Sequence, residues 1–158
     1  MELKINFKLI TAGLILAFAT SSVQAKEART AVKIFEKKCA MCHMSSKPKN
    51  KLEKSMMVAP PIAVATRSVI IGVDAIEGPV SDKELRELSI EFLTDYLYEP
   101  TRDKGYCEDM SYKKFGTMPS LKGFIKKEEL DIVVPWVIDN YTPQKDKNGK
   151  YKVSSKRK

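Results

Sequence analysis

The sequence is poor in residues that build disulfide scaffolds and catalytic centres. Among 158 residues there are three cysteines and a single histidine, His43. Three cysteines, two of them only three positions apart, do not provide the even, spaced set of a disulfide framework. A glycine-rich phosphate-binding loop is also missing. The sequence therefore excludes a disulfide-stabilised mini-protein and an enzyme that relies on such a loop.

Positive charge is concentrated at the C-terminal end of the chain. The net charge is +8, but residues 145–158 carry +6 and residues 1–25 carry +1, which leaves +1 for residues 26–144. A nearly neutral domain with a basic tail does not favour nucleic-acid binding. We expect residues 145–158 to be mobile, because apolar periodicity ends after Pro143. Such a tail suits an acidic partner or an anionic lipid surface, and equally a solvated segment without a specific role.

A short apolar run follows the N-terminus. Leu9 to Ala19 is almost wholly apolar, Lys4 and Lys8 precede it, and Val23-Gln24-Ala25 follows it. A membrane span needs about 20 apolar residues, whereas a basic start, a short apolar core and small residues at the cleavage positions are typical of a secretory signal. We expect residues 1–25 to be a signal peptide cleaved after Ala25, with an uncleaved anchor as the alternative. The remaining chain is then periplasmic if the host is a Gram-negative bacterium.

The single histidine belongs to the motif Cys39-Ala-Met-Cys42-His43. C-x-x-C-H is the attachment signature of a c-type haem. At such a site the two thiols add to the haem vinyl groups as thioethers, and the histidine presents its imidazole to the iron. Free thiols beside an unrelated histidine, or a redox C-x-x-C pair, are the alternatives. An exported chain favours haem attachment, and a histidine used in this way leaves none for a Ser-His-Asp triad.

An amphipathic helix is predicted directly before the motif. Ala28, Val32, Phe35 and Cys39 recur at i, i+4, i+7 and i+11, which defines one helical face. A helix with Phe four residues before C-x-x-C-H resembles the start of a class I c-type cytochrome. The resemblance covers roughly residues 28–141, with a variable middle. It implies an all-α fold in which helices pack around one covalently bound haem c.

The segment after the motif offers candidates for supporting roles. In the family that the chain resembles, a proline carbonyl soon after the motif accepts the second ring proton of the axial histidine, and Pro60 or Pro61 matches this position. A rigid loop corner is the alternative. Arg67 is a candidate partner for a haem propionate, or a surface residue. Residues 63–73 are apolar without a clear period, so the pattern does not separate strand from helix.

Two further helices are predicted in the C-terminal half. Ser81 and Glu84 form a capping box, and Pro100 ends the helix that follows. The apolar stripe of that helix comprises Leu85, Leu88, Phe92, Leu93 and Tyr96. Its pattern Leu-x-x-Tyr-Leu-x-x-Pro at 93–100 is similar to the helix before the distal ligand loop in class I cytochromes.

The last helix has the strongest amphipathic pattern in the chain. Its apolar positions are Leu130, Val133, Val134, Val137, Ile138 and Tyr141. Pro135 cannot donate its backbone hydrogen bond and should kink this helix. The resemblance implies that it crosses the first helix, which would bring Trp136 or Tyr141 close to Phe35.

A second iron ligand has to be a residue other than histidine. Methionine is the usual alternative, and it raises the haem potential. Met118 stands in Gly-Thr-Met-Pro, a stiff setting that resembles the family's distal ligand loop, and Met110 is the alternative. Two polar segments, residues 45–54 and 100–116, are expected to be loops. The second contains Cys107, which could be a buried inert thiol, a reactive thiol, or a thiolate ligand.

These features predict a signal peptide over 1–25, a cytochrome c domain over 26–144 and a basic tail over 145–158. The expected function is single-electron transfer between periplasmic or membrane redox proteins, acidic ones included, without enzymatic activity. Haem would be held by Cys39, Cys42, His43 and Met118, the last two as iron ligands. No nucleic acid is expected, and membrane contact would be peripheral or through an uncleaved N-terminal segment. A small haem subunit of a periplasmic oxidoreductase, for example in sulfur-compound oxidation, and a haem sensor with a labile distal ligand are the alternatives.

Overall fold

The computed structural model describes residues 24–143, 145 and 151. Among these residues the regular elements are helices, and the only pairings of strand type are two isolated bridges. The expected all-α class is therefore confirmed for this part of the chain. The elements are a helix over residues 24–38, which we call the N-terminal helix, followed by α2 (Lys51–Ser55), α3 (Ile62–Glu77), α4 (Asp82–Tyr98), α5 (Asp109–Phe115) and α6 (Lys127–Tyr141). None of these helices combines the length and the apolar character that a membrane crossing requires.

Two sequence predictions fall largely outside the described residues. The expected signal peptide, residues 1–25, is described only at residues 24 and 25, which belong to the N-terminal helix. The expected tail, residues 145–158, is described only at Lys145 and Tyr151, which pair in an isolated bridge. Lys145 Nζ also lies 3.0 Å from Asp82 Oδ1, at the start of α4. Export and tail mobility therefore remain predictions.

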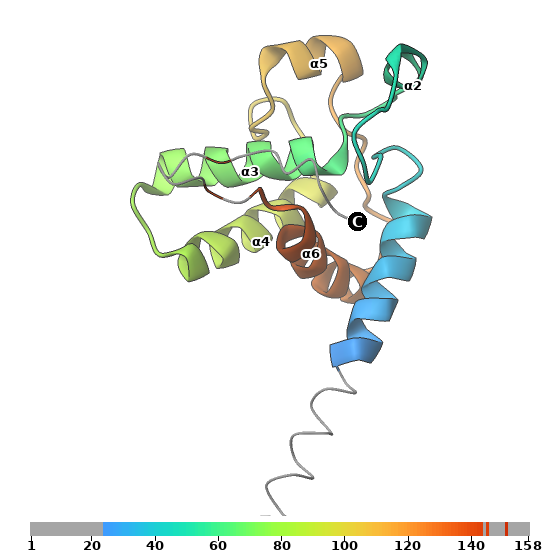
Figure 1. Cartoon of the computed structure of the whole chain (residues 1–158). Coiled ribbons are helices and arrows are strands. Elements are labelled where there is room, and N and C mark those ends of the chain that lie inside the picture. The colour runs from blue at the N-terminus through green and yellow to red at the C-terminus, as the bar shows by residue number, and fades with distance from the viewer. Residues whose placement is uncertain (1–23, 144, 146–150, 152–158) are drawn as a thin grey trace, which may run out of the picture.

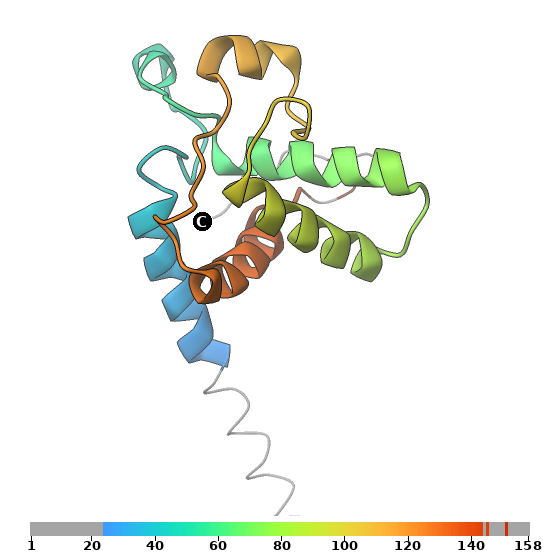
Figure 2. The ribbon, with the colours of Figure 1, turned by 180° about the vertical axis from the view of Figure 1, so that it is seen from behind.

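Four helices form what we call the frame: the N-terminal helix, α3, α4 and α6. α3 and α4 run side by side and both contact α6 (Figure 1). The N-terminal helix packs across α6, where the ring of Phe35 lies 5.4 Å from that of Trp136 and 5.5 Å from that of Tyr141. Both predicted aromatic contacts of Phe35 are thus present. Seen from behind in Figure 2, the same four helices enclose the centre of the molecule.

The apolar stripe of α6 is buried as predicted. Leu130, Val133, Val134, Val137 and Ile138 are at most 5% exposed, and Tyr141 packs against the same core. Pro135 lies inside the helix without ending it. The first turn is held by a hydrogen bond from the Lys126 amide to Glu129 Oε2 at 2.9 Å. Burial of a whole apolar face therefore outweighs the backbone hydrogen bond that Pro135 cannot make.

The buried face of the N-terminal helix differs from the predicted one. Ala31, Ile34 and Phe35 are buried, whereas Ala28 is exposed and Val32 is only partly covered. The start of this helix extends beyond α6 (Figure 1), and residues 24–30 are all exposed. The spacing of apolar residues identified the helix, but the position of α6 decides which residues it buries.

α3 and α4 form a helical hairpin. Residues 63–73, which the pattern left open, are helical and bury Val69, Ile70 and Val73 against α4. α4 begins as predicted, since Ser81 Oγ accepts a hydrogen bond from the Glu84 amide at 3.2 Å, and it ends at Tyr98, shortly before Pro100. The hairpin supplies one wall of the site described below.

The two segments expected to be loops each contain a short helix, which corrects that prediction. α2 begins where Asn50 Oδ1 accepts a hydrogen bond from the Glu53 amide at 2.9 Å, and α5 ends at Gly116 with φ 73°. We call residues 44–58 and 101–117 together the lobe. α2 and α5 stand side by side above α3 in both views (Figures 1 and 2), and Lys114 Nζ donates to the Lys54 carbonyl at 3.4 Å. No residue of the lobe is buried.

Candidate cofactor site

A cavity of about 430 Å³ lies between the frame and the lobe. Its volume falls within the range of about 300–1,000 Å³ found for small-molecule and cofactor sites. The walls are mainly apolar and come from every described helix except α2; they include Val69 of α3, Leu93 of α4, Phe115 of α5, and Val133 and Val137 of α6. All four predicted site residues line it: Cys39, Cys42, His43 and Met118.

The C-x-x-C-H motif forms a tight turn directly after the N-terminal helix. The Cys39 amide donates to the Phe35 carbonyl at 2.8 Å, which continues the helical hydrogen bonding. The Cys42 and His43 amides both donate to the Cys39 carbonyl, at 3.1 and 2.9 Å. The two thiols and the imidazole are thus brought to one cavity by a few local hydrogen bonds.

The electrostatics of the cysteines differ from those of a redox pair. Burial, and to a smaller extent the neighbouring Cys42, raise the pKa of Cys39 to about 11. The reactive cysteine of a thiol–disulfide oxidoreductase has a lowered pKa instead. The Cys39 thiol is therefore protonated at neutral pH, which favours a structural or attachment role over a redox C-x-x-C.

His43 is oriented by a backbone carbonyl. Its Nδ1 lies 2.8 Å from the Pro60 oxygen, which can only accept, so Nδ1 donates. Of the two candidate prolines, Pro60 makes this contact. Burial lowers the pKa of His43, and the Pro60 hydrogen bond partly opposes that effect. The imidazole is therefore neutral with Nε2 left as an acceptor, which is the form that ligates a metal.

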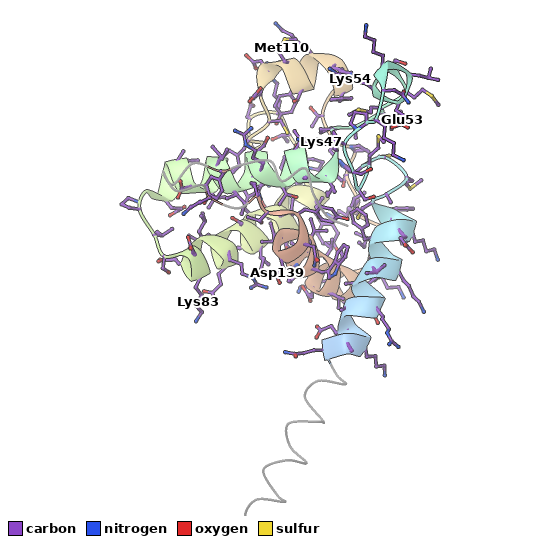
Figure 3. All side chains as sticks on the ribbon, in the orientation of Figure 1. Lys47, Glu53, Lys54, Lys83, Met110 and Asp139 are labelled. Atoms are coloured by element: carbon purple, nitrogen blue, oxygen red, sulfur yellow. The ribbon has the colours of Figure 1, made fainter. Side chains whose placement is uncertain are left out.

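The two methionines considered as distal ligands occupy different places. Met118 lines the cavity and packs against the core. Met110 is 70% exposed, does not line the cavity, and points outward from α5 (Figure 3). The segment around Met118 is anchored, since the Leu121 amide donates to the Leu97 carbonyl at 2.9 Å and Ser120 Oγ to the Tyr98 carbonyl at 2.5 Å. Of the two methionines, Met118 is therefore the one that the fold brings to the cavity.

Cys107 also lines the cavity, from a different wall. Burial raises the pKa of its thiol, and a hydrogen bond with Ser68 opposes the rise only in part. A half-buried, protonated thiol that is hydrogen-bonded to a serine fits the inert role considered for Cys107 better than the role of a thiolate ligand.

The structure does not support the role considered for Arg67. Arg67 is absent from the residues that line the cavity, and its Nε is buried without a partner. It lies on α3 directly before Ser68, which does face the cavity. One position on a helix turns a side chain by about 100°, and here that turn separates Arg67 from the cavity that Ser68 lines.

Several lining residues carried no signal in the sequence. Tyr112, Phe115 and Phe124 lie outside any long apolar stripe, and Val58 stands in the short segment between α2 and Pro60. They come together because the lobe folds over the frame. The aromatic content of residues 106–115 could have pointed to Tyr112 and Phe115, whereas Val58 and Phe124 had no such signal.

A covalently held porphyrin fits this set of residues. Two thiols of one tight turn, a neutral imidazole with a fixed ring and a thioether share one apolar cavity. These are the attachment and axial groups that a c-type haem uses. The residues present therefore agree with the cofactor that the motif predicts.

Comparison with known proteins provides no functional name. No model of a known protein family matches the chain, and no solved structure matches it. The chain is 28% identical over 131 residues to an uncharacterised protein of Aquifex aeolicus (strain VF5). That similarity covers 81% of this chain and 84% of the relative, so the two are alike over most of their lengths.

Proposed function

We propose that this protein is an exported, single-haem electron carrier of the class I cytochrome c type. The observation that supports this most is the cavity in which the C-x-x-C-H turn and Met118 meet, with His43 held by the Pro60 carbonyl. A haem bound there supplies an iron that can alternate between the ferrous and ferric states.

The residues around the cavity suit transfer of electrons rather than conversion of a substrate. Cys39 and Cys42 would hold the cofactor covalently, and His43 and Met118 would ligate its iron. With both ligands in place the iron would offer no open site to a substrate, and side chains fixed by the fold would limit rearrangement between oxidation states. The apolar walls from α4 and α6 lower the local polarity, which is one of the means by which a protein adjusts a haem potential.

The absorption spectrum of the protein, matured by export, tests this proposal. Covalent attachment predicts that the haem stays with the chain after denaturation. Ligation by Met118 predicts a sulfur–iron charge-transfer band in the ferric state, which Met118→Ala should remove. Met110→Ala is the matched control, because Met110 lies outside the cavity, and it should keep the band.

Other outcomes would assign a different function. A chain that carries no haem after export would contradict the proposal. Carbon monoxide binding to the reduced protein at neutral pH would favour a sensor with a labile distal ligand. Stable co-purification with a larger enzyme subunit would favour a component of an oxidoreductase complex.

A further inference from the structure

The hairpin of α3 and α4 is the acidic part of the domain. Residues 62–99 carry a net charge of −5, whereas residues 26–61 carry +6. Five of the eight carboxylates of the hairpin belong to residues 74–87, around the connection between the two helices. Lys83 marks this end in Figure 3, and in both ribbon views it lies away from the N-terminal helix (Figures 1 and 2). Like charges so close together repel one another unless opposite charge approaches them.

Lys145 of the basic C-terminal segment contacts this end of the hairpin. Its Nζ lies 3.0 Å from Oδ1 of Asp82, in the first turn of α4. The hydrogen bond to Asp82 is the main cause that raises the pKa of Lys145. The Asp82 side chain is 88% exposed, and an exposed ion pair is weak by itself. A second contact is therefore needed to hold the segment in place.

Tyr151 provides that second contact, which is apolar. Its side chain packs against the second core cluster, to which α3, α4 and α6 all contribute. Lys145 Nζ lies 5.2 Å from the centre of the Tyr151 ring, and the two residues pair in an isolated bridge. Burial raises the pKa of Tyr151; Lys145 opposes that rise, and the carboxylates of Asp74 and Asp82 add to it. Tyr151 is thus close to the acidic groups of both hairpin helices.

The charge of the C-terminal segment complements that of the hairpin. Residues 145–158 carry +6, against −5 for residues 62–99. Lys152, Lys156, Arg157 and Lys158 follow Tyr151. Residues 152–158 span at most about 25 Å when extended, which is close to the length of about 24 Å expected for α3. A segment tethered this closely has an effective concentration on the order of millimolar, which favours the hairpin of its own chain over another molecule.

We infer that the basic C-terminal segment binds the acidic α3–α4 hairpin of its own chain, with Tyr151 as its apolar anchor and Lys145–Asp82 as its first ion pair. The acidic partner that the charge of residues 145–158 predicts is then the hairpin itself. An acidic protein would have to compete with the hairpin for the same cations. The inference does not depend on a bound haem, since Asp82, Lys145 and Tyr151 do not line the cavity.

Carbodiimide cross-linking of the full exported chain, mapped by mass spectrometry, tests this inference, because the reagent joins only amines and carboxylates that touch. We expect links from the lysines of residues 145–158 to the carboxylates of residues 74–91. The exposed Glu128 of α6 is the comparison site and should give few links. Mixing chains that carry light and heavy nitrogen separates links within one chain from links between copies. An ionic strength of about 1 M, where the screening length is about 3 Å, should lower the yield severalfold.

Two substitutions of Tyr151 separate anchoring from general attraction between charges. Tyr151→Ala removes the packed ring and should lower the yield of links from residues 152–158 severalfold at low salt. Tyr151→Phe is the matched control, because it keeps the ring, and it should retain the links. Equal yields in Tyr151→Ala and the wild-type chain would overturn the inference.

Two other outcomes would also overturn it. Links spread evenly over the hairpin and Glu128 would show that the segment is free. Links mainly between differently labelled copies would assign the segment to a second molecule. Neither result bears on the proposed function: a chain without haem that gives the expected links overturns the proposed function alone, and a haem-bearing chain with evenly spread links overturns this inference alone.

Discussion

The frame and the lobe lie on two sides of one cavity, and the interactions that stabilise each of them are different. The buried apolar residues lie in the frame and its flanking segments, and Leu130, Val133 and Val134 of α6 are at most 1% exposed. The lobe contains no buried residue, and its two helices have five and seven residues. Helices of that length are not stable alone. The frame therefore owes its stability to apolar burial. The lobe is held by hydrogen bonds, by the ion pair of Lys104 with Asp95, by the packing of Tyr106 against Phe92, and by whatever fills the cavity.

The largest effect is expected from loss of the cofactor, which should destabilise the lobe more than the frame. Cys39→Ala/Cys42→Ala should abolish covalent haem attachment, measured as colour that stays with the denatured chain. Because binding stabilises the parts that form the site, amide exchange should then accelerate more in residues 44–58 and 101–117 than in α6. Cys107→Ser is the control that should retain haem. Equal acceleration in α6 and the lobe would show that they fold as one unit.

The next largest effect is expected when a leucine of the frame is truncated, and the same substitution in the lobe serves as its comparison. Leu130→Ala, at a fully buried position of α6, should lower the free energy of unfolding by about 2–5 kcal/mol. Leu52→Ala in α2, where the side chain is 68% exposed, should change it by less than about 0.5 kcal/mol. Denaturant midpoints at constant m-value measure both. A large cost for Leu52→Ala would mean that α2 is covered by a partner surface.

Two helix caps of the same kind provide a finer test. Ser81 Oγ caps α4 in the frame, and Asn50 Oδ1 caps α2 in the lobe. Ser81→Ala should cost about 1 kcal/mol of global stability, as loss of an N-cap usually does. Asn50→Ala should leave the global value nearly unchanged and only speed amide exchange in residues 51–55. A global loss from Asn50→Ala would contradict the separation of lobe and frame.

The smallest effect concerns an exposed ion pair within the frame. Arg86 joins α4 to α6 through two hydrogen bonds to Asp139, at 2.6 and 2.8 Å, and the hydrogen bond to Asp139 raises the pKa of Arg86. Both side chains are more than 40% exposed, so solvent screens the pair. Arg86→Ala should cost about 0–1 kcal/mol, and less at high salt. A loss that salt does not reduce would point to packing of the Arg86 stem instead.

Local patterns in the sequence determined much of the frame and the core of the site. The stripe of α6, the cap at Ser81 and the end of α4 before Pro100 follow from periodicity and backbone chemistry over a few residues. The backbone of the C-x-x-C-H turn is equally local, because the hydrogen bonds that its Cys39, Cys42 and His43 amides donate stay within residues 35–43. The short helices α2 and α5 were missed, since each is polar and has too few turns to show a period.

Only the tertiary structure decided which distant residues share the cavity. It brings Met118 and not Met110 to the cavity wall, and it joins His43 to Pro60 rather than to Pro61. It also turns Ser68 rather than Arg67 to the cavity and brings Tyr112 beside Tyr96. These choices depend on how the lobe lies on the frame, and contacts between segments tens of residues apart leave no spacing in the sequence. The N-terminal helix shows the same limit, because its apolar residues predicted a helix while the position of α6 determined its buried face.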